Sequence, residues 1–373
     1  MDFSFTEEQT LLRNSVQKYL ADNYTFEHFK KISRAEPGYS TKDWKQFAEL
    51  GLMAAPLPEA YGGLGGGPID TMVLMEEFGK ALVVEPYVST VVVGGGFFNH
   101  GGSEAQKQEW LNKIAAGETI IAFAFAEAQG RYNFADLTTT AKKNGSGYTI
   151  SGQKAVVLGA PWADALIVTA RTAGGQRDAK GVSVFIVDKK AKGVATRDYP
   201  TIDGLHASEV TFENAPATLI GTADDGLKLI EQVTDEAIAA HASEAVGAMR
   251  VLVNATVEYS KTRKQFGVPI GKFQVLQHRM VDMFMNAEQS ASITYMVTLK
   301  LGESDVERKK AASAAKVQIG KAGRFVGQQA VQIHGGMGMT DELNVGHYFK
   351  RLTMLDTLYG NVDHHLKRYA ELG

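Results

Sequence analysis

The sequence predicts an α+β protein with several domains: a helical N-terminal part, a β-rich middle and a helical C-terminal part. Its 373 residues are more than one hydrophobic core usually organises. Apolar residues recur at helical spacing near both ends, whereas short β-type runs separated by Gly, Asp and Asn turns fill the middle. Because helices and strands are segregated along the chain, a parallel sheet of βαβ units is not expected. We place the domains at residues 1–119, 120–224 and 225–373.

The N-terminal part is expected to be helical. Residues 6–9 read T-E-E-Q, which is an N-cap signal in front of apolar residues at helical spacing. A second helix is expected over 41–51, a glycine-rich loop over 57–67, and a further helical pattern over 70–78.

The middle part has the pattern of short strands. Residues 120–125 read I-I-A-F-A-F and predict a buried strand. Further β-type runs follow at 148–150, 155–158, 165–168, 182–187 and 209–212. Short strands at this spacing predict a small barrel or sandwich.

The helical period returns near Asp225 and continues to the C-terminus. Long helices are expected over 226–262, 272–301 and 305–333, followed by one last helix near 340–370.

Composition excludes several kinds of function. The chain has no cysteine, which rules out disulfides, cysteine-ligated metal sites and thiol nucleophiles. Lys and Arg number 39 and Asp and Glu 42, so the net charge of −3 gives no electrostatic reason for a nucleic-acid or membrane-surface partner. No G-x-G-x-x-G lies between a strand and a helix, and the glycines at 62–67 lack the Lys of a P-loop. His364 and His365 point about 100° apart on a helix, so we place no metal there and expect surface or interface residues.

The sequence also bears on location. It has no run of about eighteen apolar residues, and its first residues lack the basic and apolar regions of a secretory signal. We therefore expect no membrane span and a cytoplasmic location.

Four segments together resemble the acyl-CoA dehydrogenase family of flavoproteins. They are F-T-E-E-Q at 5–9, L-P-E-A-Y-G-G-L-G at 57–65, R-K-Q-F-G with the following I-G-K-F-Q at 263–274, and Q-I-H-G-G-M-G at 332–338. These segments occur in the family's order and span nearly the whole chain.

The resemblance implies a helical N-terminal domain, a middle β-barrel and a C-terminal four-helix bundle, with FAD held between barrel and bundle. It also implies an acyl-CoA substrate and an electron-transferring flavoprotein as electron acceptor. In the family, a glutamate removes the α-proton of the thioester while a hydride passes from the β-carbon to the flavin.

Two family elements reach across a subunit interface to a neighbour's FAD, and both are present here. The resemblance assigns cofactor contacts to Arg263, Gln265, Phe266, Gln332, Gly335 and Gly336. An arginine suits a pyrophosphate, and glycines let the backbone approach a ligand closely. Considered without the family, the same positions would be a surface arginine, a core phenylalanine and a glycine pair that ends a helix.

The elements that hold flavin within the chain are altered. The family's T-E-P-x-A-G-S-D matches residues 126–136, where only Glu127 and Asp136 survive clearly. The family's W-I-T/S element reads V-V-L at 156–158, and a leucine side chain cannot donate the expected hydrogen bond.

The position of the family's catalytic base is altered as well. The C-terminal Y-E-G-T aligns with L-Y-G-N at 358–361, which puts Tyr359 in place of the glutamate. A tyrosine with a pKa near 10 is a poor substitute for a carboxylate. Some members place the base at the start of the first bundle helix, where this chain has Ala237 beside Glu236.

A further candidate lies on the same predicted helix. Ala237, His241 and Glu244 are spaced i, i+4, i+7 and share one helix face, which borders the acyl pocket in the family. We therefore assign the substrate pocket to Ala237, His241 and Tyr359, and take Glu244 as the candidate catalytic residue. The alternative is a His–Glu hydrogen bond in a polar core patch or at an interface.

This pattern of retained and lost motifs resembles the small subunits of heteromeric acyl-CoA dehydrogenases of the pimeloyl-CoA or steroid side-chain type. Such a subunit shares the FAD site of a larger related chain and cannot complete a site itself. Two alternatives stay open. One is a self-sufficient homo-oligomeric dehydrogenase with a relocated base, Glu244 or Glu236, and the other is an inactive scaffold of the same fold.

Overall fold

The computed structural model describes residues 4–145 and 147–373 and confirms the predicted α+β fold class. The chain forms two compact units. The helical unit comprises Met1–Lys30, Pro68–Val83 and Ile238–Gly373, and the sheet-containing unit comprises Lys31–Gly67 and Val84–Ala237. The boundaries predicted at residues 119 and 224 stay a prediction.

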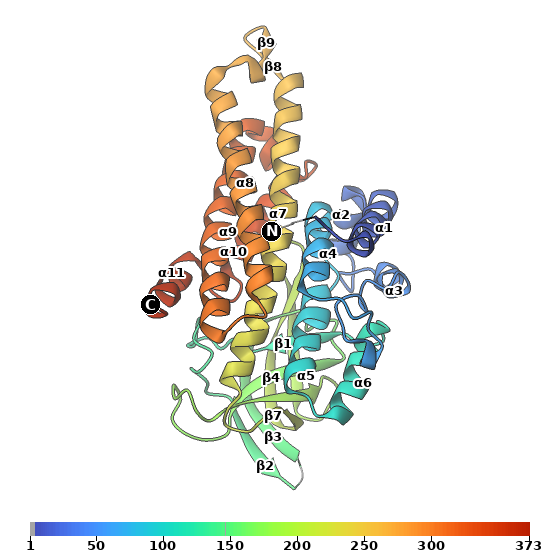
Figure 1. The fold of residues 1–373 in the computed structure, drawn as a ribbon, viewed down its shortest axis with the longest axis vertical. Helices are drawn as coiled ribbons and strands as arrows, with labels where there is room; N and C mark the ends of the chain where they lie inside the picture. The colour runs from blue at the N-terminus through green and yellow to red at the C-terminus, as the bar shows by residue number, and fades with distance from the viewer. Residues whose placement is uncertain (1–3, 146) are drawn as a thin grey trace. The chain divides into compact units, whose positions relative to one another are not determined.

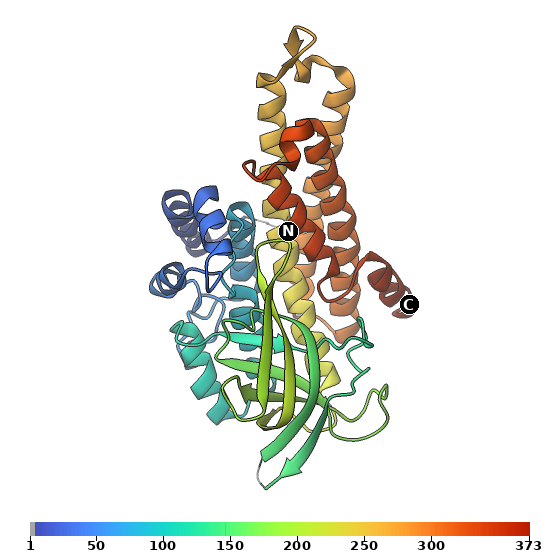
Figure 2. The same ribbon diagram turned by 180° about the vertical axis from the view of Figure 1, so that it is seen from behind.

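A seven-stranded sheet in the sheet-containing unit closes into a barrel (Figure 2). β4 pairs with β5, β5 with β7, β7 with β3 and β3 with β2, all antiparallel. One parallel pair, Thr140 with Arg171, joins β2 back to β4, while β1 and β6 attach to β4 and β7. The strands are β1 Ile121–Ala124, β2 Thr140–Asn144, β3 Gly147–Leu158, β4 Ala165–Arg171, β5 Val182–Asp188, β6 Val194–Pro200 and β7 His206–Ile220.

The predicted strands correspond to the apolar part of this barrel. β4, A-L-I-V-T-A-R, is buried along its whole length, as a continuous apolar run predicts. β2 and β6 were not expected because their residues are mostly polar and exposed. β3 joins two predicted runs, and a bulge between Lys154 and Val157 lets this long strand bend.

Short helices complete the sheet-containing unit. The expected helix over 41–51 is α3, which Ser40 caps at its first turn. The elements are α3 Thr41–Glu49, η1 Glu59–Tyr61, the π-helical η2 Val88–Gly94, α5 Gly95–Gly101 and α6 Glu104–Ala115, while α2 Phe26–Arg34 crosses between the units.

The helical unit is built around a bundle of four helices, α7 to α10 (Figure 1). A cluster of buried residues joins α7, α8 and α9, and its small alanines let the helices approach closely. The predicted capping box at Thr6 begins α1. The elements are α1 Glu7–Asn23, α4 Pro68–Ala81, α7 Leu227–Thr262, α8 Gln274–Lys300, α9 Asp305–His334, α10 Val345–Thr357 and α11 Val362–Glu371.

Glycines bring α4 against the part of α7 that carries Glu244. A Cβ atom on Gly79 would lie 2.0 Å from the Glu244 carbonyl oxygen, and one on Gly247 would lie 2.0 Å from the Glu76 oxygen. Neither position can hold a larger residue without separating the helices. This close packing fixes the backbone around Glu244.

The last part of the chain differs from the prediction. The single helix expected near 340–370 is two helices, α10 and α11, because Tyr359 and Gly360 have positive φ angles of 56° and 119°. Such backbone cannot continue a right-handed helix. His365 is buried instead of lying at the surface, with Nδ1 facing the Ser313 hydroxyl and Nε2 the Tyr359 carbonyl oxygen.

Within residues 4–145 and 147–373, no helix combines the length and the hydropathy that crossing a membrane requires.

Candidate functional site

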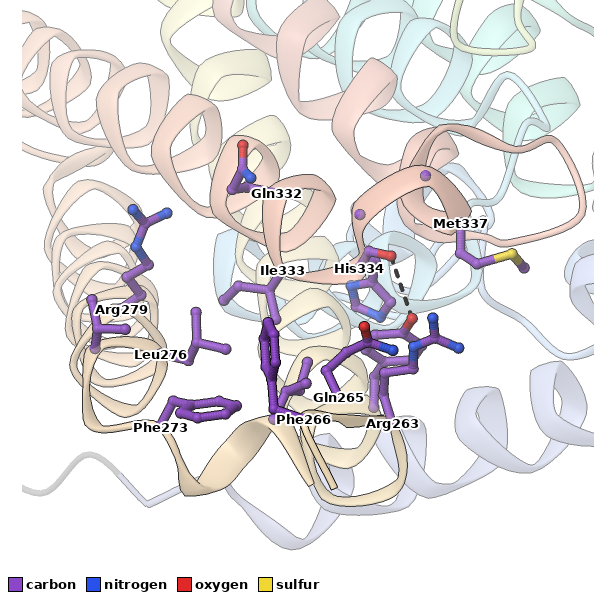
Figure 3. Close-up of a pocket in the computed structure, with 15 residues that line it drawn as sticks. Arg263, Gln265, Phe266, Phe273, Leu276, Arg279, Gln332, Ile333, His334 and Met337 are labelled. Atoms are coloured by element: carbon purple, nitrogen blue, oxygen red, sulfur yellow. Dashed lines mark hydrogen bonds between the residues drawn. The ribbon is translucent and has the colours of Figure 1, made fainter. Parts of the chain in front are cut away.

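The six predicted cofactor residues line one open cavity in the helical unit. Its volume is about 710 Å³ (Figure 3). Two segments separated by more than sixty residues supply these side chains: the chain that follows α7 and the end of α9. The cavity is lined by Tyr259, Arg263, Gln265, Phe266, Ile270, Phe273, Val275, Leu276, Arg279, Gln332, Ile333, His334, Gly335, Gly336 and Met337.

A hairpin after α7 presents the first group. β8 (Lys264–Gln265) pairs with β9 (Val268–Pro269), and the two residues between them have positive φ angles, 53° and 82°. A two-residue turn of this kind reverses the chain tightly. It leaves Phe266 93% exposed. An aromatic side chain held out of every core is available to cover a ligand or a partner.

Arg263 brings an available positive charge to the cavity. It lies where α7 passes into the hairpin, and its backbone bonds to Tyr259 and Ile270 fix that junction. The side chain is exposed, and its guanidinium has no hydrogen bond or ion pair to any residue that the structure describes. Unlike Arg279, whose Nη1 lies 3.2 Å from the Gln329 amide oxygen, Arg263 keeps all its donors for a ligand.

The end of α9 supplies the second group. Gly335 follows the last helical residue with φ 62° and ψ −144°, a backbone conformation open essentially to glycine alone. Neither Gly335 nor Gly336 has another atom within 4 Å of the place where a Cβ would stand. The turn therefore offers bare backbone to the cavity.

Tyr259 and His334 connect the two groups. Their rings stack with centroids 4.3 Å apart, and the Tyr259 hydroxyl donates to the His334 carbonyl oxygen at 3.4 Å (Figure 3). The sequence prediction missed both residues. Their positions held a signal, because Tyr259 lies one helical turn before Arg263 and His334 directly precedes Gly335.

The donor set of this cavity fits a dinucleotide such as FAD. An unpaired arginine and an exposed glycine turn suit a pyrophosphate. Apolar side chains from Phe266, Phe273 and Leu276 suit a flat aromatic ring, and Figure 3 shows them between Arg263 and Arg279. The space beside the glycines leaves room for the ligand's approach.

Glu244, the predicted catalytic residue, lies in a buried ion pair. Arg351 Nε and Nη2 donate to its two carboxylate oxygens at 2.5 and 3.0 Å, and His241 Nδ1 is 3.0 Å away. Burial alone would raise the pKa of Glu244, but the Arg351 charge and the hydrogen bond from His241 outweigh it and lower the pKa to about 2. These contacts are the ones expected if His241 and Glu244 form a polar patch in the core. The role of Glu244 as catalytic base stays a prediction.

The three predicted pocket residues lie in the protein interior. Ala237 is fully buried in α7, and the His241 and Tyr359 rings lie 6.1 Å apart in the helical unit. Tyr359 packs against the bundle core, and burial raises the pKa of its phenol above the ordinary value. Their assignment to a substrate pocket stays a prediction. Glu236, the neighbour of Ala237, instead faces His100 Nε2 at 2.7 Å.

The two surviving residues of the altered barrel motif are both engaged in structural contacts. Glu127 accepts from Lys154 Nζ at 2.7 Å, and the Lys154 side chain is fully buried. Burial raises and the lysine lowers the pKa of Glu127, with a net fall to about 2. Asp136 accepts from Gln176 and Arg177 at 2.6 and 2.7 Å. Both carboxylates therefore organise loops at the end of the barrel.

Comparison with known proteins gives consistent matches over the whole length. Models of the acyl-CoA dehydrogenase N-terminal, middle and C-terminal domains match residues 6–118, 122–215 and 224–371. The chain is 31% identical over 354 residues to the probable acyl-CoA dehydrogenase YngJ of Bacillus subtilis, and the match covers 92% of each chain.

Solved structures agree with the sequence matches. A variant of the Tcur3481–Tcur3483 steroid ACAD superposes with a TM-score of 0.90 at 27% identity, covering 98% of this chain and 97% of that one. Butyryl-CoA dehydrogenase from Megasphaera elsdenii superposes with a TM-score of 0.91 at 25% identity, covering 100% and 99%.

Proposed function

The chain belongs to the acyl-CoA dehydrogenase family of FAD-dependent oxidoreductases, and we propose that it acts there as the small subunit of a hetero-oligomer. In this role it contributes one wall of a FAD site. The catalytic base and the other half of the site come from a larger, related chain, and electrons pass on to an electron-transferring flavoprotein.

The observation that carries this proposal is the cavity at the hairpin and the end of α9. All six residues that the family uses across a subunit interface line it, and its most prominent side chain, Phe266, is almost fully exposed. An aromatic residue held in strained backbone with no core around it is explained by an occupant that the chain itself does not supply.

The carboxylates of this chain also support a catalytic base that comes from the larger chain. Tyr359 stands at the family's base position, and Glu244 is neutralised by Arg351. A carboxylate with a pKa of about 2 is a weak proton acceptor, because a general base works best with a pKa near the operating pH. A glutamate from another chain fits the missing function.

The barrel residues also support a flavin site that is completed by another chain. Glu127 and Asp136 are already bonded within the barrel, and V-V-L at 156–158 offers no hydroxyl. A hetero-oligomer also agrees with one similar solved structure, a steroid ACAD that is named after two proteins, Tcur3481 and Tcur3483.

The chain's own residues have clear tasks toward the cofactor. FAD, when bound, supplies the electron acceptor for α,β-dehydrogenation of an acyl-CoA thioester. Arg263 neutralises phosphate charge, the turn at Gly335 and Gly336 lets backbone approach, and Phe266 covers an apolar part of the ligand and excludes water.

The test is the substitution Arg263→Ala in the chain co-purified with a larger relative that carries an intact T-E-P-x-A-G-S-D motif. Losing a charge-assisted contact should weaken FAD retention about tenfold or more. Lys261→Ala is the matched control, because Lys261 is exposed and already paired with Glu258. Equal flavin content in both variants, measured by visible absorption per mole of protein, would contradict the proposal.

A self-sufficient homo-oligomeric dehydrogenase is the second candidate. Glu236 favours it. The carboxylate contacts His100, which is itself only partly buried, and the Glu236 side chain keeps an exposure of 20%. In that case Glu236→Gln should abolish dehydrogenation by the chain purified alone without changing its flavin content. An unaltered rate would remove Glu236 from consideration.

A further inference from the structure

We infer that His334 contacts the bound ligand directly: its Nε2 accepts a hydrogen bond from an N–H or O–H donor on the adenosine part of the dinucleotide. This inference rests on the proposed function of the cavity, and it adds a residue that the cofactor motifs do not assign. It follows from the tautomer, the orientation and the surroundings of one ring.

The tautomer follows from the partner of Nδ1. That nitrogen lies 2.8 Å from the Ala330 carbonyl oxygen, one turn earlier in α9. A carbonyl oxygen only accepts, so Nδ1 carries the hydrogen. In the neutral ring Nε2 then has a lone pair and no hydrogen. Burial favours this neutral form by lowering the pKa of His334, although the bond to Ala330 acts the other way.

The orientation of the ring is fixed from two sides. The bond to Ala330 ties it to α9, and the Tyr259 ring stacks on its face at 4.3 Å. The residue is only 4% exposed, yet it lines the cavity. Nε2 has no hydrogen-bond partner among the described residues. Nε2 is not one of the buried and unpaired side-chain atoms of the described residues, so it reaches the open space of the cavity, where a donor on a ligand can approach it.

The surroundings select the kind of donor. Next to His334, Gly335 and Gly336 expose backbone, and Arg263 offers positive charge, so phosphate groups belong on this side of the cavity. Phosphates themselves only accept hydrogen bonds. The donors nearest to them in an adenosine diphosphate group are the ribose hydroxyls, followed by the exocyclic amine of adenine. His334 is thus placed to accept a hydrogen bond from the adenosine part of the ligand, which Arg263, a donor only, cannot do.

The experiment titrates ADP into the full-length chain and measures affinity by calorimetry. The variant His334→Phe keeps a ring for Tyr259 to stack on but removes the acceptor. ADP affinity should fall about threefold to tenfold in this variant. His278→Phe is the matched control, because His278 is exposed on α8 and does not line the cavity.

Ligand analogues identify the donor. Inosine diphosphate lacks the amine, and the two deoxyadenosine diphosphates each lack one ribose hydroxyl. One of these analogues should bind the unsubstituted chain about as weakly as ADP binds His334→Phe, and that variant should no longer distinguish it from ADP. If the unsubstituted chain binds all of them equally well, the inference is wrong.

A direct signal comes from the imidazole nitrogens of the unsubstituted chain. Nitrogen NMR should show Nε2 as an unprotonated ring nitrogen, and ADP should move its resonance to lower shift as it accepts a hydrogen bond. An Nε2 resonance that stays in place at saturating ADP overturns the inference, even if His334→Phe does not fold.

The two proposals fail in different ways. If His334→Phe binds ADP as the unsubstituted chain does while Arg263→Ala binds it more weakly, the role of His334 is wrong and the cofactor cavity stands. If Arg263→Ala binds ADP as well as the unsubstituted chain does, both fall. If the unsubstituted chain shows no ADP binding at millimolar concentration, the inference about His334 falls, while the flavin content of the complex still decides the proposed function.

Discussion

Two roles are open for Glu244. Its buried ion pair with Arg351 indicates a structural role, whereas its position on α7 makes it the candidate catalytic base. Replacing it by Gln removes the negative charge that faces the buried Arg351 guanidinium. We expect Glu244→Gln to lower the free energy of unfolding by about 3 kcal/mol at neutral pH. Urea unfolding measures this change, and Glu258→Gln, at an exposed ion pair, should change it by less than about 0.5 kcal/mol.

The pH dependence gives the same residue a second test. The pKa of Glu244 is lowered from 4.5 to about 2 in the folded chain, so the carboxylate stabilises the fold above pH 4.5. That contribution is lost as the pH falls toward 2, where the carboxylate is protonated. The difference between the unsubstituted chain and Glu244→Gln should therefore shrink over this window. A constant difference would mean that the ion pair does not carry the effect.

At the scale of elements, the turn that ends α9 makes a matched pair of predictions. Both glycines lie in the 3₁₀ turn η4 (Gly335–Met339) and have open space beside them, but only Gly335 has a positive φ, 62°. Gly335→Ala should lower the free energy of unfolding by about 1–3 kcal/mol through backbone strain. Gly336→Ala should change it by less than about 0.5 kcal/mol. Equal losses in urea unfolding would show that strain is not the reason for glycine here.

Elements differ in how well the sequence predicts them. The long helices α7, α8 and α9 follow from a repeating apolar period, and their predicted bounds lie within a few residues of the observed ones. The break at Tyr359 and Gly360 was missed, because a positive φ at tyrosine has no signal in residue type. β2 and β6 were missed because barrel pairing, and not hydrophobicity, makes their polar residues extended.

At the scale of the whole molecule, the order of helices and strands and the family motifs predicted the fold class and the residues of one cavity. Contacts between distant segments could not be predicted in this way. Arg351 lies 107 residues from Glu244, and Lys154 lies 27 residues from Glu127. Neither pair has a motif, because many arginines and lysines could neutralise a buried carboxylate. His334 was not predicted as a ligand contact, because that role depends on the direction in which one ring nitrogen points.

We propose that this chain carries only part of a flavin site. The most direct test is the visible absorption spectrum of the chain purified alone, compared with the chain co-purified with its larger relative at equal protein concentration. We expect no flavin band from the chain alone and a clear band from the complex. A near-stoichiometric flavin band from the chain alone would contradict the claim and make the homo-oligomeric dehydrogenase the better account.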